Sequence, residues 1–192
     1  MYKLANVFLS LLLVAYPFFV FFSLDSLPLR TLTICLFILF VLRFILVFRQ
    51  PQYPSRYLKL FALCSTILGC VLALVAFMFQ HENSLLFYPV LMNLLAFCVF
   101  AASLIYPPSI IEIFARIMDK NLPEHAINYT RNVTIAWCIF FIINGSAAFL
   151  TVVANDMTLW TWYNGLISYL LMGLFFIIEF GIRQYVKRKH KH

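Results

Sequence analysis

The chain has 192 residues, of which 64% are hydrophobic and 11% charged, whereas a soluble domain carries about 45–50% apolar and about 25% charged residues. A water-soluble fold of this length cannot bury so much apolar surface, which excludes a soluble catalytic domain and indicates a protein whose solvent is the lipid bilayer. The formal net charge of +7 is confined to short loops and one tail, a distribution that argues against a nucleic-acid-binding face.

Six apolar runs are long enough to cross a bilayer as helices. A spanning helix needs about 20 apolar residues to cross roughly 30 Å of hydrocarbon. The predicted spans are residues 5–24, 29–48, 58–79, 85–105, 133–154 and 162–182. The sequence therefore predicts an all-α, polytopic membrane protein that forms a single transmembrane domain over residues 1–192.

The first run follows Lys3 and has some features of a signal peptide. It is longer than the apolar core of a typical signal and lacks an A-x-A cleavage site, so we expect a retained helix. Pro17 lies within this run and predicts a kink, because proline removes a backbone donor and clashes with the preceding turn.

Lysine and arginine are distributed unevenly between the two sides of the predicted spans. Of the 14 basic residues, Arg30 lies in an outer loop, Arg43 lies within the second span, and all others lie on the opposite side. Because basic loops remain in the cytoplasm, this asymmetry predicts that both termini are cytoplasmic. The basic tail over residues 183–192 belongs to that side, and the outer loops are too short to hold a domain.

The longest segment between predicted spans, residues 107–131, lies on the predicted cytoplasmic side. Ser109 followed three residues later by Glu112 is a capping-box pattern and predicts the start of a short helix. One face of that helix is apolar and charged residues lie elsewhere, which is typical of a helix in the membrane interface. The apolar residues are Ile110, Phe114, Ile117 and Met118, and the charged ones are Glu112, Arg116, Asp119 and Lys120. A second helix is expected to begin after Pro123 and to continue into the fifth span.

Two charged residues, Arg43 and Glu179, lie away from the ends of the predicted spans, at membrane depth, where such groups are the best indicators of function. Arg43 and Glu179 lie at nearly the same distance from the cytoplasmic ends of the second and sixth spans. We propose that they form an ion pair, because an opposite charge offsets the cost of desolvation. The alternatives are that each side chain extends separately to the headgroups, or that the two take part in substrate binding or proton coupling.

Two asparagines, Asn93 and Asn144, fall near the middle of the fourth and fifth spans. Amides at this depth usually form hydrogen bonds between helices, although a polar cavity is the alternative. The run from Asn144 to Ala148 contains small residues that allow two helices to approach closely. The matching surface on the fourth span consists of Ala96, Ala101, Ala102 and Ser103.

Other polar and aromatic candidates lie toward the ends of the spans. Trp160, Trp162 and Tyr163 are expected to form an outer aromatic belt, with Tyr88 in the same role on the fourth span. The cytoplasmic-interface candidates are Glu112, Arg116, His125, Arg131 and Trp137. His125 with Glu124 and Asp119 suggests an acid–base cluster, but a solvated helix start is the interpretation that we favour.

The sequence contains no H-E-x-x-H, G-x-S-x-G or P-loop motif. The cysteines all fall in apolar runs, without C-x-x-C spacing or a histidine partner, so we expect neither disulfides nor a metal site. We assign no catalytic residue and expect no cofactor.

The last third of the chain resembles the YciB (intracellular septation protein A) family of bacterial inner-membrane proteins. The positions that carry the resemblance are Arg131, Asn132, Ala136, Trp137, Phe140, Phe141, Gly145, Ala154 and Trp160. The stretches Asn164-Gly165 and Tyr169–Gly173 depart from that pattern.

These departures are closer to a second group of bacterial membrane proteins, whose genes accompany those for aryl-polyene and fatty-acid-like biosynthesis. Some members carry a ketosynthase label, which this chain does not merit because it has no acyl-accepting cysteine motif. Both resemblances imply a Gram-negative inner membrane and a role in envelope lipids. The matching positions include Pro107-Pro108, Leu122-Pro123, Tyr129–Arg131, Asn144-Gly145, Tyr163–Ile167 and Glu179.

The function that we expect is a non-enzymatic accessory role in envelope lipid or aryl-polyene-type metabolism. The protein would bind or present an anionic lipid or a lipid-linked product, and would dock a biosynthetic enzyme or acyl carrier protein on the interfacial segment and basic tail. A small transporter or flippase of an amphipathic substrate is the first alternative. A membrane enzyme that acts on an acyl or prenyl chain is the second.

Overall fold

The computed structural model describes residues 16–24, 27–50, 53, 55–80, 83–118 and 122–189, and its secondary structure within these ranges is entirely helical. The elements are α2 (Tyr16–Leu24), α3 (Leu29–Arg49), α4 (Arg56–Phe79), α5 (Asn83–Leu86), α6 (Tyr88–Ile105), α7 (Ile110–Met118), α8 (Glu124–Val153), α9 (Met157–Trp162), the π-helix η1 (Tyr163–Ile167) and α10 (Ser168–Lys189).

Five helical segments in the described part are long and apolar enough to cross a membrane. They are Leu29–Arg49, Arg56–Phe79, Asn83–Ile105, Ala126–Val153 and Met157–Gln184, which correspond to the last five predicted spans. The first predicted span falls mostly outside the described residues, and only its end is present as α2. The kink predicted at Pro17 needs the preceding turn, which also lies outside the described residues.

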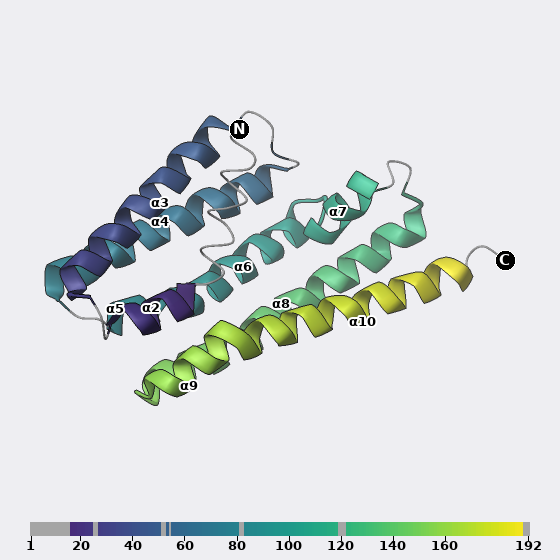
Figure 1. Ribbon diagram of the computed structural model, residues 1–192. Coiled ribbons are helices and arrows are strands. Elements are labelled where there is room, and N and C mark those ends of the chain that lie inside the picture. Colours follow the sequence, from purple (N-terminus) through teal and green to yellow (C-terminus); the bar gives the residue numbers. More distant parts are fainter. Residues whose placement is uncertain are drawn as a thin grey trace.

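The helices form two antiparallel pairs that pack side by side (Figure 1). Helices α3 and α4 make one pair, α6 and α8 make the other, and α4 packs against α6. Helix α10 runs beside α8 at the outside of the bundle. We call the end at which α8 stops and α9 begins the α9 end, and the end that carries α7 the α7 end (Figure 1).

Small residues allow both pairs to approach closely. A Cβ at Gly69 of α4 would overlap the ring of Phe40 of α3, a side chain that is only 1% exposed. A Cβ at Gly145 of α8 would lie 3.0 Å from the Cβ of Asn93 on α6. The second contact confirms the close approach that the small residues after Asn144 predicted.

The fourth spanning segment is broken at Phe87 into α5 and α6. Pro89 has no N–H to donate to the Leu85 carbonyl four residues earlier, so the helical ladder is interrupted there. Side chains from distant helices supply the donors. The Tyr16 hydroxyl of α2 donates to the Leu85 carbonyl at 3.0 Å, and the Trp160 indole of α9 donates to the Leu86 carbonyl at 3.0 Å.

These contacts correct part of the predicted aromatic belt. Trp160 is 1% exposed and is a core residue, because its N–H is used inside the bundle. Tyr88 is also buried, with its ring centroid 4.5 Å from that of Tyr16 and 5.5 Å from that of Phe40. Trp162 is exposed, as expected of a belt residue.

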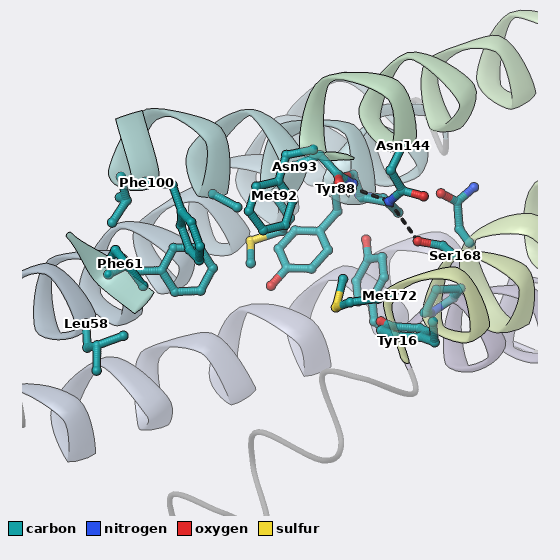
Figure 2. A pocket seen from close by; sticks show the side chains of 18 of the residues that line it. Tyr16, Leu58, Phe61, Tyr88, Met92, Asn93, Phe100, Asn144, Ser168 and Met172 are labelled. Atoms are coloured by element: carbon teal, nitrogen blue, oxygen red, sulfur yellow. Dashed lines mark hydrogen bonds between the residues drawn. The ribbon is translucent and has the colours of Figure 1, made fainter. Parts of the chain in front are cut away.

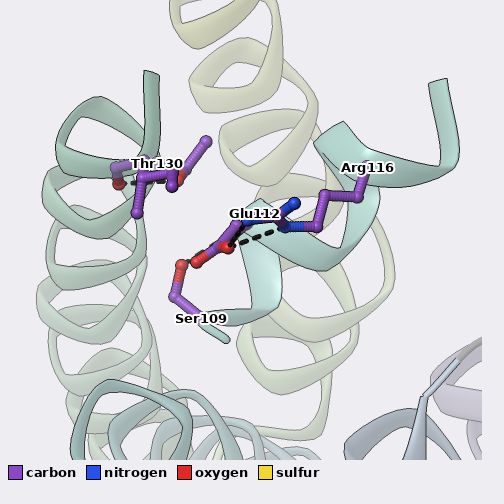
Figure 3. Close-up of polar contacts among 5 residues, drawn as sticks. Ser109, Glu112, Arg116 and Thr130 are labelled. Atoms are coloured by element: carbon purple, nitrogen blue, oxygen red, sulfur yellow. Dashed lines mark hydrogen bonds and ion pairs between the residues drawn. The ribbon is translucent and has the colours of Figure 1, made fainter. Parts of the chain in front are cut away.

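The start of α7 (Ile110–Met118) is held by two serines, one on α6 and one at its own N-cap. The Ser103 hydroxyl accepts a hydrogen bond from the Ile110 N–H at 3.1 Å. Ser109 caps α7 as predicted, because its hydroxyl accepts from the Glu112 N–H at 3.4 Å. The Glu112 carboxylate does not complete a capping box but accepts from Arg116 Nε at 2.8 Å (Figure 3).

One charged residue of α7 departs from the predicted arrangement, in which the apolar face meets the acyl chains and the charged residues lie elsewhere. Glu112 is buried, whereas Phe114 and Ile117 are exposed. The reason is that α7 packs against α6 and α8, so Ile110, Ile113 and Glu112 all face the bundle.

An aromatic cluster joins α6, α8 and α10. Trp137 of α8 is buried, with its ring centroid 4.7 Å from that of Phe175 on α10 and 6.3 Å from that of Phe100 on α6. Trp137 was predicted at the cytoplasmic interface, but it is a core residue that fixes α10 against the rest of the bundle.

We expect Gly69→Ala to lower the free energy of unfolding by about 1–3 kcal/mol, because the added methyl group overlaps the buried Phe40 ring. The matched control is Gly173→Ala on α10, where a Cβ meets no atom within 4 Å. That change should be neutral or should stabilise the helix by up to about 1 kcal/mol. Unfolding of both variants in detergent, followed by circular dichroism, checks this; equal effects at the two sites would contradict it.

Candidate functional site

A cavity of about 440 Å³ lies at the centre of the bundle, among residues of all the long helices and of α2, α7 and η1. Small-molecule sites have volumes of about 300–1,000 Å³ and combine apolar walls with a few polar groups. This cavity has that character, because one part of its lining is apolar and another part carries amides, phenols and one arginine.

The apolar part of the lining, which we call the apolar arm, lies toward the α7 end. It consists of Leu58 and Phe61 from α4, Val99 and Phe100 from α6, and Ile110 and Phe114 from α7. Figure 2 shows Leu58, Phe61 and Phe100 together at one end of the cavity, away from the asparagines. The arm exists because α7 packs against α6 and α8, and the hydrogen bond from the Ile110 N–H to the Ser103 hydroxyl joins α7 to α6.

The polar part is organised by Asn144 of α8, whose side chain is 2% exposed. Its Nδ2 donates to Asn93 Oδ1 on α6 at 3.0 Å and to Ser168 Oγ on α10 at 2.8 Å (Figure 2). Its Oδ1 accepts a hydrogen bond from the Tyr163 hydroxyl at 3.0 Å. We call these residues, together with Asn164, the amide cluster. The interhelical bond predicted for Asn93 and Asn144 is confirmed, and both residues also line the cavity.

The π-helix η1 brings Asn164 into the same cluster. A π-turn holds one residue more than an α-turn, and such turns are frequent at functional sites. Asn164 Nδ2 donates to Thr151 Oγ1 at 3.1 Å and to the Trp160 carbonyl at 2.9 Å. Gly165 lets α2 pack onto this turn, because a Cβ there would lie 2.8 Å from the Phe18 ring. Tyr163 was predicted in the aromatic belt, but its hydroxyl belongs to the amide cluster.

Arg43 is the cation of the described cavity lining. It lies on α3, and its Nε atom is buried without a hydrogen-bond partner. The phenols of Tyr88 and Tyr169 line the cavity as well. Tyr88 is close enough to interact electrostatically with both Arg43 and Tyr169, so these three groups form one polar region.

The predicted ion pair between Arg43 and Glu179 is not formed in the structure. Glu179 lies on α10 outside the cavity lining, and its electrostatic neighbours are Arg183 on the same helix and Tyr129 of α8. The Tyr129 hydroxyl donates to the Glu179 backbone carbonyl at 3.3 Å. Arg43 and Glu179 lie at similar depths in their spans, but their helices are not neighbours. Helix α3 packs against α4 and α2, whereas α10 contacts η1.

The remaining cytoplasmic-interface candidates lie away from the cavity. Glu112 and Arg116 form an ion pair at 2.8 Å, and Arg131 is exposed on α8. His125 lies in the first turn of α8, and its side chain is outside the described residues.

Sequence reasoning did not identify Tyr88, Tyr169 or Ser168 as site residues. A tyrosine or serine in an apolar run carries no sign of which way it faces, so only Asn164, an amide within the last span, offered a usable signal. Comparisons of the chain with family models, curated proteins and solved structures gave no match.

Asn144→Ala is expected to lower the free energy of unfolding by about 1–2 kcal/mol, because it removes hydrogen bonds to three side chains on three helical elements. Ser146→Ala, at an exposed position of the same helix, is the control and should change stability little. In a double-mutant cycle, Asn93→Ala and Asn144→Ala should be non-additive. Additive effects would contradict a shared network.

Proposed function

We propose that this protein is a membrane-embedded binding protein for a lipid-like amphiphile. The observation that carries the proposal is the central cavity, which joins the apolar arm to the amide cluster and Arg43. An amphiphile has the same division into a chain and a polar head. The volume of about 440 Å³ suits one chain or a single-chain molecule, since a two-chain phospholipid exceeds the drug-sized ligands that such volumes hold.

Selectivity in such a site comes from its polar part. A chain that leaves the bilayer for the apolar arm gains little, because lipid tails are as apolar as leucine side chains. The head gains more, since the amides, phenols and arginine offer hydrogen bonds that the hydrocarbon region lacks. The cavity therefore suits recognition of a head group, with the arm setting the length and shape of the chain.

A binding role also fits the chemistry of the lining. Its polar residues are an arginine, amides, a serine and tyrosines, which hold and orient a ligand but do not make up a nucleophile–base pair. Together with the resemblance to bacterial envelope families, this favours an accessory role in envelope lipid metabolism at the inner membrane. The protein would hold its ligand for a biosynthetic partner rather than transform it.

We further propose an orientation with the α7 end in the cytoplasm and both termini on that side, which the distribution of lysine and arginine supports. A reporter that is active only outside the cytoplasm should be inactive when fused after the last residue. The same reporter inserted at Asn155, in the exposed turn between α8 and α9, should be active. The reverse pattern would overturn the orientation.

Filling the cavity should displace the bound amphiphile. In Ala96→Phe a ring enters the cavity from α6, and in Met172→Trp a larger ring enters from α10. Both variants, purified in native-lipid particles, should lose a lipid-like species that mass spectrometry finds enriched with the unmodified protein. Leu94→Phe is the control, because Leu94 lies on the exposed face of α6 and should leave that species unchanged.

Thermal unfolding of each variant shows whether the bundle remains folded. If folded cavity-filling variants retained the enriched species, or if the unmodified protein carried bulk lipid alone, the binding proposal would fail.

A further inference from the structure

The charge balance of the cavity identifies the kind of head group it takes. Arg43 lies within a spanning segment, and its Nε is buried without a partner. The ionisable groups near its guanidinium are the phenols of Tyr88 and Tyr53, not carboxylates. In the described part of the chain, the guanidinium therefore has no anion beside it.

The acidic residues that the structure describes all lie outside the cavity lining. Glu112 pairs with Arg116, and Asp156 caps α9 by accepting from the Leu159 N–H at 3.0 Å. Glu124 is exposed in the first turn of α8, and Glu179 lies beside Arg183 and Tyr129. None of the four lines the cavity.

A desolvated cation without a counter-ion is unfavourable, and buried charges in proteins are normally paired. A neutral glutamine at position 43 would still offer hydrogen bonds and would not carry that cost. The arginine is accounted for if the negative charge arrives with the ligand.

We propose that the cavity binds an anionic amphiphile with a single acyl or prenyl chain, whose carboxylate or phosphate oxygens contact Arg43. This inference rests on the proposed function and adds the charge and position of the head group. The guanidinium presents its N–H groups in a fork that matches carboxylate and phosphate oxygens.

The neighbouring phenols complete the head-group site. Tyr88 lies near Arg43, and Tyr169 lies near Tyr88 in the same lining. Each hydroxyl can donate one hydrogen bond to an anionic oxygen. Tyr16 does not contribute in this way, because its hydroxyl already donates to the Leu85 carbonyl. The chain of the ligand then extends into the apolar arm toward Phe61, Phe100 and Phe114.

The experiment measures the binding of radiolabelled palmitate to the full-length protein in phosphatidylcholine nanodiscs, with empty nanodiscs as background. Hexadecanol has the same chain with a neutral head, and inorganic phosphate has an anionic head without a chain. We expect palmitate to bind and hexadecanol to compete at least about tenfold more weakly, because a hydrogen bond to a charged group contributes about 1.5–3 kcal/mol. Phosphate alone should not compete.

Arg43→Gln should weaken palmitate binding by about tenfold to a hundredfold, and Arg43→Lys should retain part of it because the charge remains. Arg49→Gln is the matched control, since Arg49 is an exposed arginine at the end of the same helix. Without ligand, the thermal stability of Arg43→Gln should equal or exceed that of the unmodified protein, which separates loss of binding from loss of folding. Nanodiscs that contain phosphatidylglycerol test whether a two-chain anionic phospholipid competes with palmitate. We expect no competition, and strong competition would overturn the single-chain ligand while leaving the anionic head group at Arg43 intact.

Equal binding of palmitate and hexadecanol, insensitive to Arg43→Gln, would overturn the anionic head group and leave the binding of amphiphiles intact. Competition by phosphate alone, as strong as by palmitate, would overturn the role of the chain. If neither palmitate nor hexadecanol bound, while the cavity-filling variants still retained the same lipids, the proposed function would fail as well.

Discussion

The proline at position 89 imposes a constraint on which much of the bundle depends. It leaves the Leu85 carbonyl without its helical donor, and a buried carbonyl without a partner is costly where water cannot reach it. The Tyr16 hydroxyl satisfies Leu85, and the Trp160 indole satisfies the neighbouring Leu86 carbonyl. One break in the fourth spanning segment thereby fixes α2 and α9 against the start of α6, although they are far apart in the chain.

The cavity follows from the positions of those elements. With α2 held against α5, the Tyr16 ring packs on Tyr88, and both rings form part of the cavity wall. With α9 held in place, the π-turn that follows it directs Asn164 toward Thr151 and lies against Phe18 of α2. The small residue at Gly145 brings α8 close enough to α6 for Asn144 to reach Asn93. The amide cluster thus stabilises the bundle and provides a polar wall for the cavity.

The two kinds of polar group in the cavity differ in what they contribute. The amides all have hydrogen-bond partners within the bundle, so packing alone explains their presence. Arg43 is different, because its buried Nε has no partner and no described carboxylate lies near it. An ionisable side chain in a spanning segment has a high free-energy cost. Because Arg43 gains no described ion pair in return, a bound ligand is the better explanation for its presence. This contrast is why the proposed head-group site is placed at Arg43 rather than at the asparagines.

Hydropathy was enough to predict the lipid solvent and the spanning helices, because twenty-residue apolar runs and sparse charge leave few alternatives. The two mid-span amides predicted hydrogen bonds between helices, and the structure shows that Asn144 and Asn93 bond to each other. The capping serine predicted the start of α7 at Ser109. The direction in which single side chains face became evident only from the packed helices. Glu112 is buried, Trp160 and Trp137 lie in the core, and Arg43 does not meet Glu179, because rotation about a helix axis and the order of neighbouring helices are not encoded in hydropathy. The cavity belongs to this second class, since its walls come from helices that span most of the chain and its polar groups converge only when those helices pack.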